Sequence, residues 1–362
     1  MPERSVRAGQ GHVKSTHRKY VQNASNMGQI EDGSVDLVVT SPPYPMIEMW
    51  DACFGRQDPG VFTALQAADG WKAFDRMHRV LDGVWDEICR VLKPGRFLCV
   101  NIGDAVRKTG GEFGLFPNHS RIISAMINRG MTPLPCILWR KQTNAPNKFM
   151  GSGMLPAGAY ATLEHEYILI FRKGGKRSFN TAEERQVRRE SAIFWEERNN
   201  WYSDIWYDLK GIRQQLTDNR VRKRSAAFPF DLPYRLISMY SVAGDTVLDP
   251  FSGIGTTMFA AMASGRGSIS VEIEKDFDGI GLNTSLHAGE IAGFANRLMQ
   301  SRIDRHMSFV EERMRDGKPM KYINRNYGFP VVTRQETDLF FRPLASVRAD
   351  GKDGFTVEYS GE

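Results

Sequence analysis

The chain has 362 residues, with 48 Lys and Arg against 42 Asp and Glu, and a net charge of +6. Hydrophobic residues make up 41% and charged residues 25%, which is typical of a globular protein and excludes wholesale disorder. No apolar run reaches the roughly eighteen residues of a membrane span, and the N-terminal residues hold no apolar signal segment. We therefore expect a cytoplasmic protein of two domains or of one elaborated α/β domain.

The four cysteines, Cys53, Cys89, Cys99 and Cys136, include no Cys-x-x-Cys pair and no histidine at a spacing typical of zinc. Reduced thiols packed within the protein are the simplest interpretation of this pattern. We predict no metal site.

Short runs of β-branched and aliphatic residues alternate with helical stretches along the chain. Strands are predicted at 18–22, 36–40, 96–101, 133–139, 166–171, 246–249 and 268–272. Helices are predicted at 71–92, 118–129, 230–242, 256–264 and 276–300. Nearly continuous apolar strands that alternate with helices indicate a parallel sheet covered on both faces, hence an α/β fold.

The tetrapeptide Ser41-Pro42-Pro43-Tyr44 directly follows the predicted strand 36–40. Two successive prolines fix φ and donate no backbone hydrogen bond, so the carbonyls of Ser41 and Pro42 point in fixed directions. A fixed carbonyl and a serine hydroxyl can accept hydrogen bonds from an exocyclic amino group, while Tyr44 offers a flat face to an extruded base. The alternative is a proline-stiffened turn with a core tyrosine.

Residues 172–225 interrupt the alternation of strands and helices. They hold fourteen basic and eight acidic side chains, an excess of six that equals the net charge of the whole chain, with seven aromatic residues interleaved. Basic and aromatic residues together suit a surface that binds phosphates and stacks on bases. A solvated helical hairpin is the alternative. The candidate DNA-binding residues are Arg185, Arg188, Arg189, Arg222, Lys223 and Arg224.

A second loop, Asp249–Thr257, follows a predicted strand and begins a predicted helix. Gly253 and Gly255 let the backbone pass close to a ligand, and the helix N-terminus offers free N–H groups. Glu272 ends the next strand, where an acid can hold ribose hydroxyls. No third glycine makes room for a pyrophosphate. This arrangement therefore favours a nucleoside cofactor without phosphates.

Together, the two loops resemble those of the amino-methylating DNA methyltransferases, which modify N4 of cytosine or N6 of adenine with S-adenosylmethionine. In that family a Ser/Asp/Asn-Pro-Pro-aromatic loop is catalytic, and an Asp-Pro-Phe-x-Gly-x-Gly-Thr-Thr loop binds the cofactor. The order here, catalytic loop first, is similar to that of the β group. Further matches are Ser34–Val38, Val91–Gly95, His165–Tyr167 and Ala226–Pro229.

The resemblance implies a role for each matching residue. The catalytic residues would be Ser41, Pro42, Pro43 and Tyr44. The cofactor-binding residues would be Asp249, Pro250, Phe251, Ser252, Gly253, Gly255, Thr256, Thr257, Glu272, Asn23 and Phe228. Asn23 departs from the family, which often has Gly-Asp after the strand equivalent to 18–22.

The implied fold is a Rossmann-like, seven-stranded methyltransferase sheet with circularly permuted motif order. The two loops would then face each other across one cleft at the topological switch point. We expect a catalytic domain made of 18–171 and 225–300, a target-recognition insert at 172–224, and an extension at 301–362 whose role the sequence leaves open: it can pack on the catalytic domain, contact a second subunit or touch DNA.

The implied reaction is direct methyl transfer to a flipped base, without a covalent enzyme intermediate. Ser41 and the Pro42 carbonyl would accept the amino hydrogens and localise the nitrogen lone pair. Serine at the first loop position is similar to the N4-cytosine enzymes, whereas aspartate is usual in N6-adenine enzymes, which are the closest alternative. Enzymes acting on RNA or protein glutamine normally carry Asn-Pro-Pro-Tyr. A catalytically inactive DNA-binding regulator is the remote alternative.

The resemblance also implies the partners. Double-stranded DNA is the expected substrate and S-adenosylmethionine the expected cofactor. A cognate restriction endonuclease and a second copy of the chain are the candidate protein partners.

Overall fold

The computed structural model describes residues 13–141, 150–209, 228–275, 288–351 and 354–360. Within them, ten strands form one sheet in the order β10-β6-β9-β3-β2-β11-β12-β1-β16-β15. These strands are β1 (Val13–Val21), β2 (Val35–Thr40), β3 (Leu92–Ile102), β6 (Met131–Arg140), β9 (His165–Lys173), β10 (Ile205–Trp206), β11 (Thr246–Asp249), β12 (Gly267–Glu272), β15 (Leu344–Ala349) and β16 (Gly354–Tyr359).

The seven strands from β6 to β1 in this order are the predicted ones, so the predicted Rossmann-like sheet is confirmed. Strands β1, β12, β11, β2 and β3 run parallel, while β9 runs antiparallel between β3 and β6. The carboxyl ends of β2 and β11 therefore lie side by side, and we call this edge the cleft edge. The amino ends of the same strands form the opposite edge.

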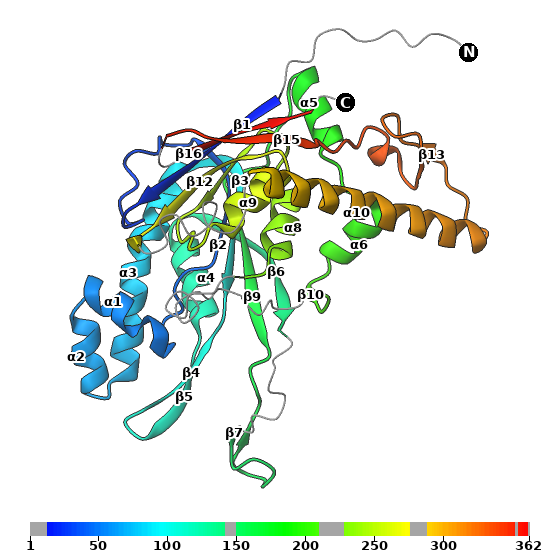
Figure 1. The fold of residues 1–362 in the computed structure, drawn as a ribbon. Coiled ribbons are helices and arrows are strands. Elements are labelled where there is room, and N and C mark those ends of the chain that lie inside the picture. Colours follow the sequence, from blue (N-terminus) through cyan, green and yellow to red (C-terminus); the bar gives the residue numbers. More distant parts are fainter. Residues whose placement is uncertain (1–12, 142–149, 210–227, 276–287, 352–353, 361–362) are drawn as a thin grey trace, which may run out of the picture.

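Helices cover both faces of the sheet (Figure 1). α3 (Gly70–Val91) and α4 (Asn118–Asn128) pack on one face, and α8 (Asp231–Tyr240) and α9 (Thr256–Ala263) on the other. Strand β2 shows why, because Val38 joins the first core while Leu37 and Val39 join the second. Successive side chains of a strand point to opposite faces, and an all-apolar strand is buried on both.

The remaining elements lie around this sheet. They are η1 (Glu48–Trp50), α1 (Asp51–Gln57), α2 (Gly60–Gln66), the hairpins β4 (Ala105–Thr109) to β5 (Glu112–Phe116) and β7 (Met150–Gly151) to β8 (Ala159–Tyr160), α5 (Ala182–Glu190), α6 (Trp195–Trp201), α10 (Ala288–Arg315), β13 (Tyr322–Ile323), β14 (Pro330–Val331) and η3 (Arg334–Glu336). In the described residues, no helix is long and apolar enough to cross a membrane.

The C-terminal extension packs on the catalytic domain and on the insert. β16 pairs antiparallel with β1, and the β15–β16 hairpin thereby extends the central sheet. Arg302 of α10 forms a buried ion pair with Glu197 of α6, with an N–O distance of 2.6 Å. Phe194 stacks on His306 with ring centroids 4.0 Å apart. Segments 172–209 and 301–342 thus pack against each other through charged and aromatic contacts.

The helix predicted at 276–300 differs from α10, which begins at Ala288 in the described residues and continues to Arg315. The prediction ends at residue 300 because the apolar periodicity of the helix weakens there. Beyond this point Arg302 and His306 contact the insert through a charged and an aromatic group.

Candidate functional site

The loop from Asp249 to Thr257 connects β11 to α9 at the cleft edge. Gly253 has a φ of 51° and Gly255 a φ of 89°, so the turn needs two residues that adopt the left-handed region without strain. Gly255 is the N-cap of α9, and the amide of Ser252 donates to the carbonyl of Val271 at 3.0 Å. The glycine pair thus makes the sharp strand-to-helix turn that the sequence indicated.

Asp249 holds the two functional loops together. Its carboxylate accepts hydrogen bonds from the hydroxyl of Thr40 at 2.7 Å, from the hydroxyl of Thr257 at 2.6 Å and from the amide of Phe251 at 3.1 Å. Thr40 directly precedes Ser41, so this one side chain connects both loops. Burial raises the pKa of Asp249 to about 6, and the hydroxyl donors oppose that rise. Asp249, Gly255 and Thr257 are absent from the pocket lining, so their contribution is to the scaffold of the loops.

Glu272 ends β12 beside the same loop. One carboxylate oxygen accepts from the amide of Gly253 at 2.7 Å, and the other from the amide of Glu274 at 3.0 Å. Burial raises the pKa of Glu272 above its usual value, against these backbone hydrogen bonds and the charge of Lys19. Each oxygen keeps a lone pair for a ligand, because a carboxylate oxygen can accept two hydrogen bonds.

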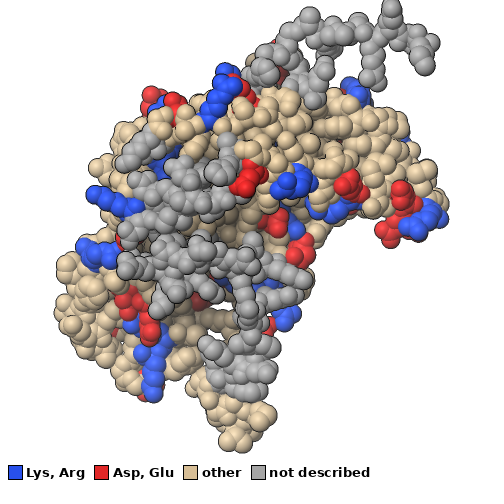
Figure 2. All heavy atoms as spheres, in the orientation of Figure 1, with Lys and Arg blue, Asp and Glu red and all other residues tan. Residues whose placement is uncertain are grey.

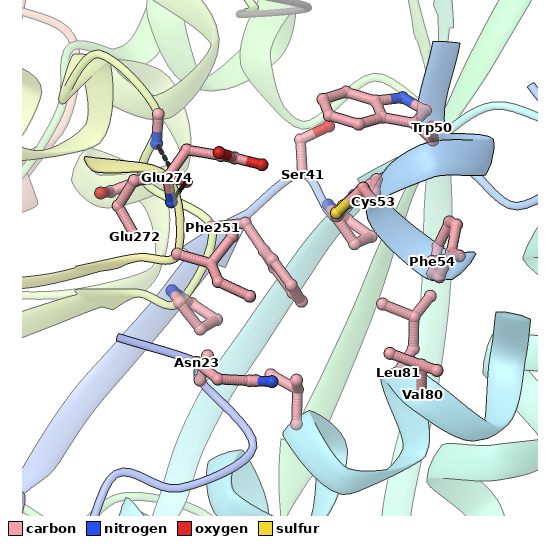
Figure 3. Close-up of a pocket in the computed structure, with 18 of the residues that line it drawn as sticks. Asn23, Ser41, Trp50, Cys53, Phe54, Val80, Leu81, Phe251, Glu272 and Glu274 are labelled. Atoms are coloured by element: carbon pink, nitrogen blue, oxygen red, sulfur yellow. Dashed lines mark hydrogen bonds between the residues drawn. The ribbon is translucent and has the colours of Figure 1, made fainter. Parts of the chain in front are cut away.

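The two loops line a single pocket of about 1030 Å³, its open mouth included (Figure 3). Twelve of the predicted site residues line it: Asn23, Ser41, Pro42, Pro43, Tyr44, Phe228, Pro250, Phe251, Ser252, Gly253, Thr256 and Glu272. Figure 3 shows Phe251 projecting into the pocket between Asn23 and the side chains of α1 and α3. The predicted meeting of two loops about two hundred residues apart is thus observed.

The opposite wall of the pocket comes from residues that the sequence did not single out. They are Trp50, Cys53, Phe54 and Gln57 of η1 and α1, and Val80, Leu81 and Val84 of α3. The side chain of Asn23 donates to the Gln57 carbonyl oxygen at 2.9 Å. Arg56 and Glu274 form an ion pair that joins α1 to the loop after β12. The seven residues of α1 are too few for a strong periodic signal, and the α3 residues lie in the predicted helix 71–92 but belong to no motif, so sequence reasoning missed this wall.

Tyr44 of the predicted catalytic loop is held by a polar network. Its hydroxyl lies 3.2 Å from the Ser41 hydroxyl and donates to Glu166 at 2.9 Å. Asn101 donates to the same Glu166 oxygen at 2.7 Å, and Lys141 forms an ion pair with the other oxygen. Burial and the charge of Glu166 raise the pKa of Tyr44 well above its usual value. The phenol therefore stays protonated, and its ring has a fixed orientation in the cleft.

The close packing behind Tyr44 leaves little room for a side chain at Gly103. A Cβ there would lie 3.0 Å from the Tyr44 ring, tighter than ordinary van der Waals contact. The amide of Asn118 donates to the carbonyls of Gly103 and Pro45 at 2.9 and 3.1 Å. These contacts fix the loop after β3 against the catalytic loop.

The predicted DNA-binding residues fall into two groups. Arg185, Arg188 and Arg189 lie on α5, which follows β9 at the opposite edge of the sheet. They line a groove there, and Arg189 forms an ion pair with Asp338 at 3.0 Å. The structure thus places them away from the pocket. Arg222, Lys223 and Arg224 lie outside the described residues.

The described residues contain no group of three His, Cys, Asp or Glu side chains that could hold a metal ion. All four cysteines are free, and only Cys53 among them lines the pocket. The described site is a cleft whose lining combines polar and apolar side chains.

Comparisons with known proteins match this chain over most of its length. Residues 35–280 match the family model described as DNA methylase. Type II methyltransferase M.MthZI of Methanothermobacter thermautotrophicus is 51% identical over 328 residues, covering 90% of each chain. Type II methyltransferase M.MjaI of Methanocaldococcus jannaschii is 46% identical over 274 residues, covering 73% of this chain and 89% of that one. Among solved structures, TTHA0409 of Thermus thermophilus, complexed with S-adenosyl-L-methionine, superposes with a TM-score of 0.57 at 30% identity, covering 73% of this chain and 91% of that one.

Proposed function

Because the chain belongs to the N6/N4 family of DNA methylases, we propose that it transfers a methyl group from S-adenosylmethionine to N4 of a cytosine in duplex DNA. Methylation of an exocyclic amino group in DNA is the reaction of the family. The choice of cytosine is the finer step, and one observation carries it: Ser41 stands first in the catalytic loop, where adenine enzymes usually have aspartate.

The pocket fits the cofactor. The Ser252 hydroxyl lines the pocket, is buried and has no hydrogen-bond partner within the described protein, so it is available to a ligand. Glu272 offers lone pairs to ribose hydroxyls, and Phe251, Val80 and Leu81 give an apolar surface for a purine ring. S-adenosylmethionine, when bound, supplies an electrophilic methyl group.

The catalytic loop acts on the amino group of the target base. That nitrogen is a poor nucleophile because its lone pair is delocalised into the ring. The Ser41 hydroxyl and the Pro42 carbonyl accept hydrogen bonds from its N–H groups and localise the lone pair on nitrogen. Tyr44, held by Glu166 and Asn101, offers its ring as a stacking surface for the base. These residues hold the base and orient its nitrogen in the same cleft as the cofactor residues.

Analysis of nucleosides by mass spectrometry tests the choice of base. DNA incubated with the protein and S-adenosylmethionine is expected to contain N4-methylcytosine. Ser41→Ala is expected to lower the rate about a hundredfold, because it removes one hydrogen-bond acceptor from the transition state. N6-methyladenine would support the adenine enzyme in its place. Unmodified DNA under all conditions would support the inactive regulator.

We propose that the DNA contacts nearest the target base come from 210–225. These residues hold six basic and one acidic side chains, against eight basic and seven acidic in 172–209. Both flanks of the segment are at the cleft edge, since the Leu209 carbonyl accepts a hydrogen bond from Trp139 at 3.0 Å and Phe228 lines the pocket. DNA binding by Arg185, Arg188 and Arg189 stays a prediction, and their place at the opposite edge supports a smaller part for them.

Two triple variants with equal loss of charge test this assignment. Replacing Arg222, Lys223 and Arg224 with alanine is expected to weaken DNA binding and to reduce the slope of log Kd against log salt by up to about 3, since each phosphate contact contributes about 0.9. Replacing Arg185, Arg188 and Arg189 is expected to leave that slope nearly unchanged. The reverse result would assign the DNA surface to α5. A cognate restriction endonuclease and a homodimer stay predictions.

A further inference from the structure

The hairpin β7–β8 carries a surface that the reaction described above does not use. Residues 150–163 contain no charged side chain. Met154 and Leu155, at the turn of the hairpin, are 86% and 70% exposed, more than any other large hydrophobic residue described. Pro156 follows them. Figure 2 shows the corresponding end of the molecule free of both Lys/Arg and Asp/Glu side chains. Large contiguous apolar patches mark binding surfaces, and two adjacent exposed apolar side chains on an uncharged turn are a candidate for one.

The hairpin has a defined structure. Met150 pairs with Tyr160 and Gly151 with Ala159. The Ser152 amide donates to the carbonyl of Gly158 at 2.8 Å, and its hydroxyl donates to the carbonyl of Leu155 at 2.6 Å. These bonds close the turn, so Met154 and Leu155 project from a fixed support.

The neighbouring hairpin supports it. Tyr160 of β8 stacks on Phe113 of β5, with ring centroids 5.2 Å apart and an interplanar angle of 13°. The β4–β5 hairpin is itself joined to α1 by a double hydrogen bond from Arg107 to Asp51, each at 2.8 Å. Figure 1 shows both hairpins projecting from the same end of the molecule. They form one arm.

The arm is connected in the chain to the polar network that holds Tyr44. Its β7–β8 hairpin lies in the chain between β6 and β9 at the cleft edge, where Lys141 pairs with Glu166 and Glu166 binds the hydroxyl of Tyr44. The nine residue steps from Glu164 back to Leu155 span at most about 32 Å, which bounds the distance between this network and the apolar turn. A duplex whose base enters the pocket is therefore presented at the end of the molecule from which this arm projects.

We infer that the Met154–Leu155 turn is a wedge that enters the base stack of DNA and fills the space left by the flipped base. Extruding a base leaves its neighbours unstacked, and proteins that deform DNA commonly insert Met, Leu or Pro side chains between base steps. An uncharged turn suits this role, because it brings no carboxylate near the phosphates. This inference rests on the proposed function, since it requires a flipped target base.

The test compares two duplexes and three proteins at the methylation site found by sequencing modified bases. One duplex pairs the target base normally, and the other places it opposite an abasic site. The proteins are wild type, Met154→Ala/Leu155→Ala, and the control Met314→Ala/Ile323→Ala, which removes two apolar side chains that are 61% and 55% exposed at the end of α10 and on β13. All substituted residues are exposed, so thermal unfolding midpoints should agree.

The wedge variant is expected to methylate the paired duplex about tenfold or more slowly in a single turnover, and to regain most of the wild-type rate on the pre-opened duplex. On the paired duplex with 2-aminopurine at the target position, the wedge variant should also give lower fluorescence than wild type, because fewer bases are flipped. The control should behave as wild type on both duplexes, and Kd for S-adenosylmethionine should not change.

If the wedge variant loses the same share of its methylation rate on both duplexes, or loses none on either, the wedge is overturned. A changed sedimentation coefficient of the variant without DNA would overturn it in favour of a contact with a second copy. A wild-type protein that methylates neither duplex would remove the proposed function itself, and the wedge with it, which distinguishes the two failures.

Discussion

The two ends of β11 hold buried carboxylates in different ways. Asp249, at the cleft end, accepts hydrogen bonds from two threonine hydroxyls and a backbone amide. Asp245, directly before the strand, accepts two hydrogen bonds from the guanidinium of Arg177 at 2.6 and 3.0 Å. Four residues apart, one acid is held by neutral donors and the other by a cation.

The difference extends to the surrounding elements. Behind the opposite edge, buried or half-buried carboxylates pair with arginines, as in Arg302–Glu197 and Arg342–Glu190. Such pairs join α5, α6 and the C-terminal extension, and fully satisfied buried pairs mainly specify which segments meet. At the cleft, Asp249 joins the two predicted site loops through neutral hydroxyls and one backbone amide. The two ends of β11 are thus anchored by different means, a cation at one end and neutral donors at the other.

The largest effect should follow from breaking the ion pair at the opposite edge. Arg177→Ala leaves Asp245 buried without its cationic partner, and we expect the free energy of unfolding to fall by about 3 kcal/mol. The methylation rate per folded molecule should stay close to wild type, because the pair lies at the edge away from the pocket. Denaturant unfolding and active-site-normalised kcat measure the two quantities.

Arg172→Ala is the matched control for this variant. Its guanidinium donates to the carbonyl of Gly174 at 3.0 Å, near the same turn, and that bond is exposed. We expect less than about 1 kcal/mol from it. A large loss of kcat in Arg177→Ala would contradict the expectation that this pair acts on stability alone.

At the cleft end, the raised pKa of Asp249 predicts a pH dependence. Unfolded, this carboxyl loses its proton near 3.8, and folded it does so near 6. Between these values the folded protein binds more protons, so the stability that this group contributes is present below pH 3.8 and is lost as pH rises through 6. Asp249→Asn cannot titrate. Relative to wild type, its free energy of unfolding should therefore rise by on the order of 2 kcal/mol between about pH 4 and 7.

Unfolding by denaturant at several pH values measures this difference. Asp51→Asn serves as control for the removal of one carboxylate, because Asp51 is half-buried and paired with Arg107 at the base of the arm. If the difference between Asp249→Asn and wild type stays constant over that pH range, the carboxyl of Asp249 is not held in the way described above.

Particular residues show how far the sequence alone leads. The order of the central strands was implied by the family resemblance that the two loops carry, and glycines at a strand-to-helix turn and consecutive prolines after a strand give those loops their restricted backbone shapes. Twelve of the fifteen predicted catalytic and cofactor residues line the pocket. Asp249 shows what the sequence does not reveal. Its motif predicts a place in the site, but only the structure shows its hydrogen bond to Thr40, 209 positions away in the sequence.

Other features depend on contacts that leave no local pattern. α1 forms a wall of the pocket through Cys53, Phe54 and Gln57, yet its seven residues are too few for a periodic signal. β10 has two residues and pairs with β6 only through tertiary context. The basic excess of 172–225 was correctly counted, but charge counts do not tell which edge of a sheet a helix reaches, and α5 lies at the opposite edge from the pocket.

The smallest effect should come from Glu166, which positions Tyr44 without lining the pocket. One of its oxygens accepts from both Tyr44 and Asn101, and the other pairs with Lys141. In Glu166→Gln, one of these oxygens becomes an NH2 group that faces a donor, so part of the network is lost. We expect kcat to fall about tenfold while the Kd of S-adenosylmethionine stays unchanged, because only the orientation of the tyrosine ring is affected.

Glu164→Gln is the matched control, since Glu164 lies two residues earlier and pairs with Arg140 on the surface, where the two side chains are 40% and 56% exposed. It should leave kcat unchanged, because exposed ion pairs contribute little. Removing the charge of Glu166 should also lower the pKa of Tyr44, since that charge and its hydrogen bond both raise it. A variant with normal kcat would show that Tyr44 keeps its orientation through packing against Gly103 alone, and the cleft edge would then depend on Asp249 more than on this network.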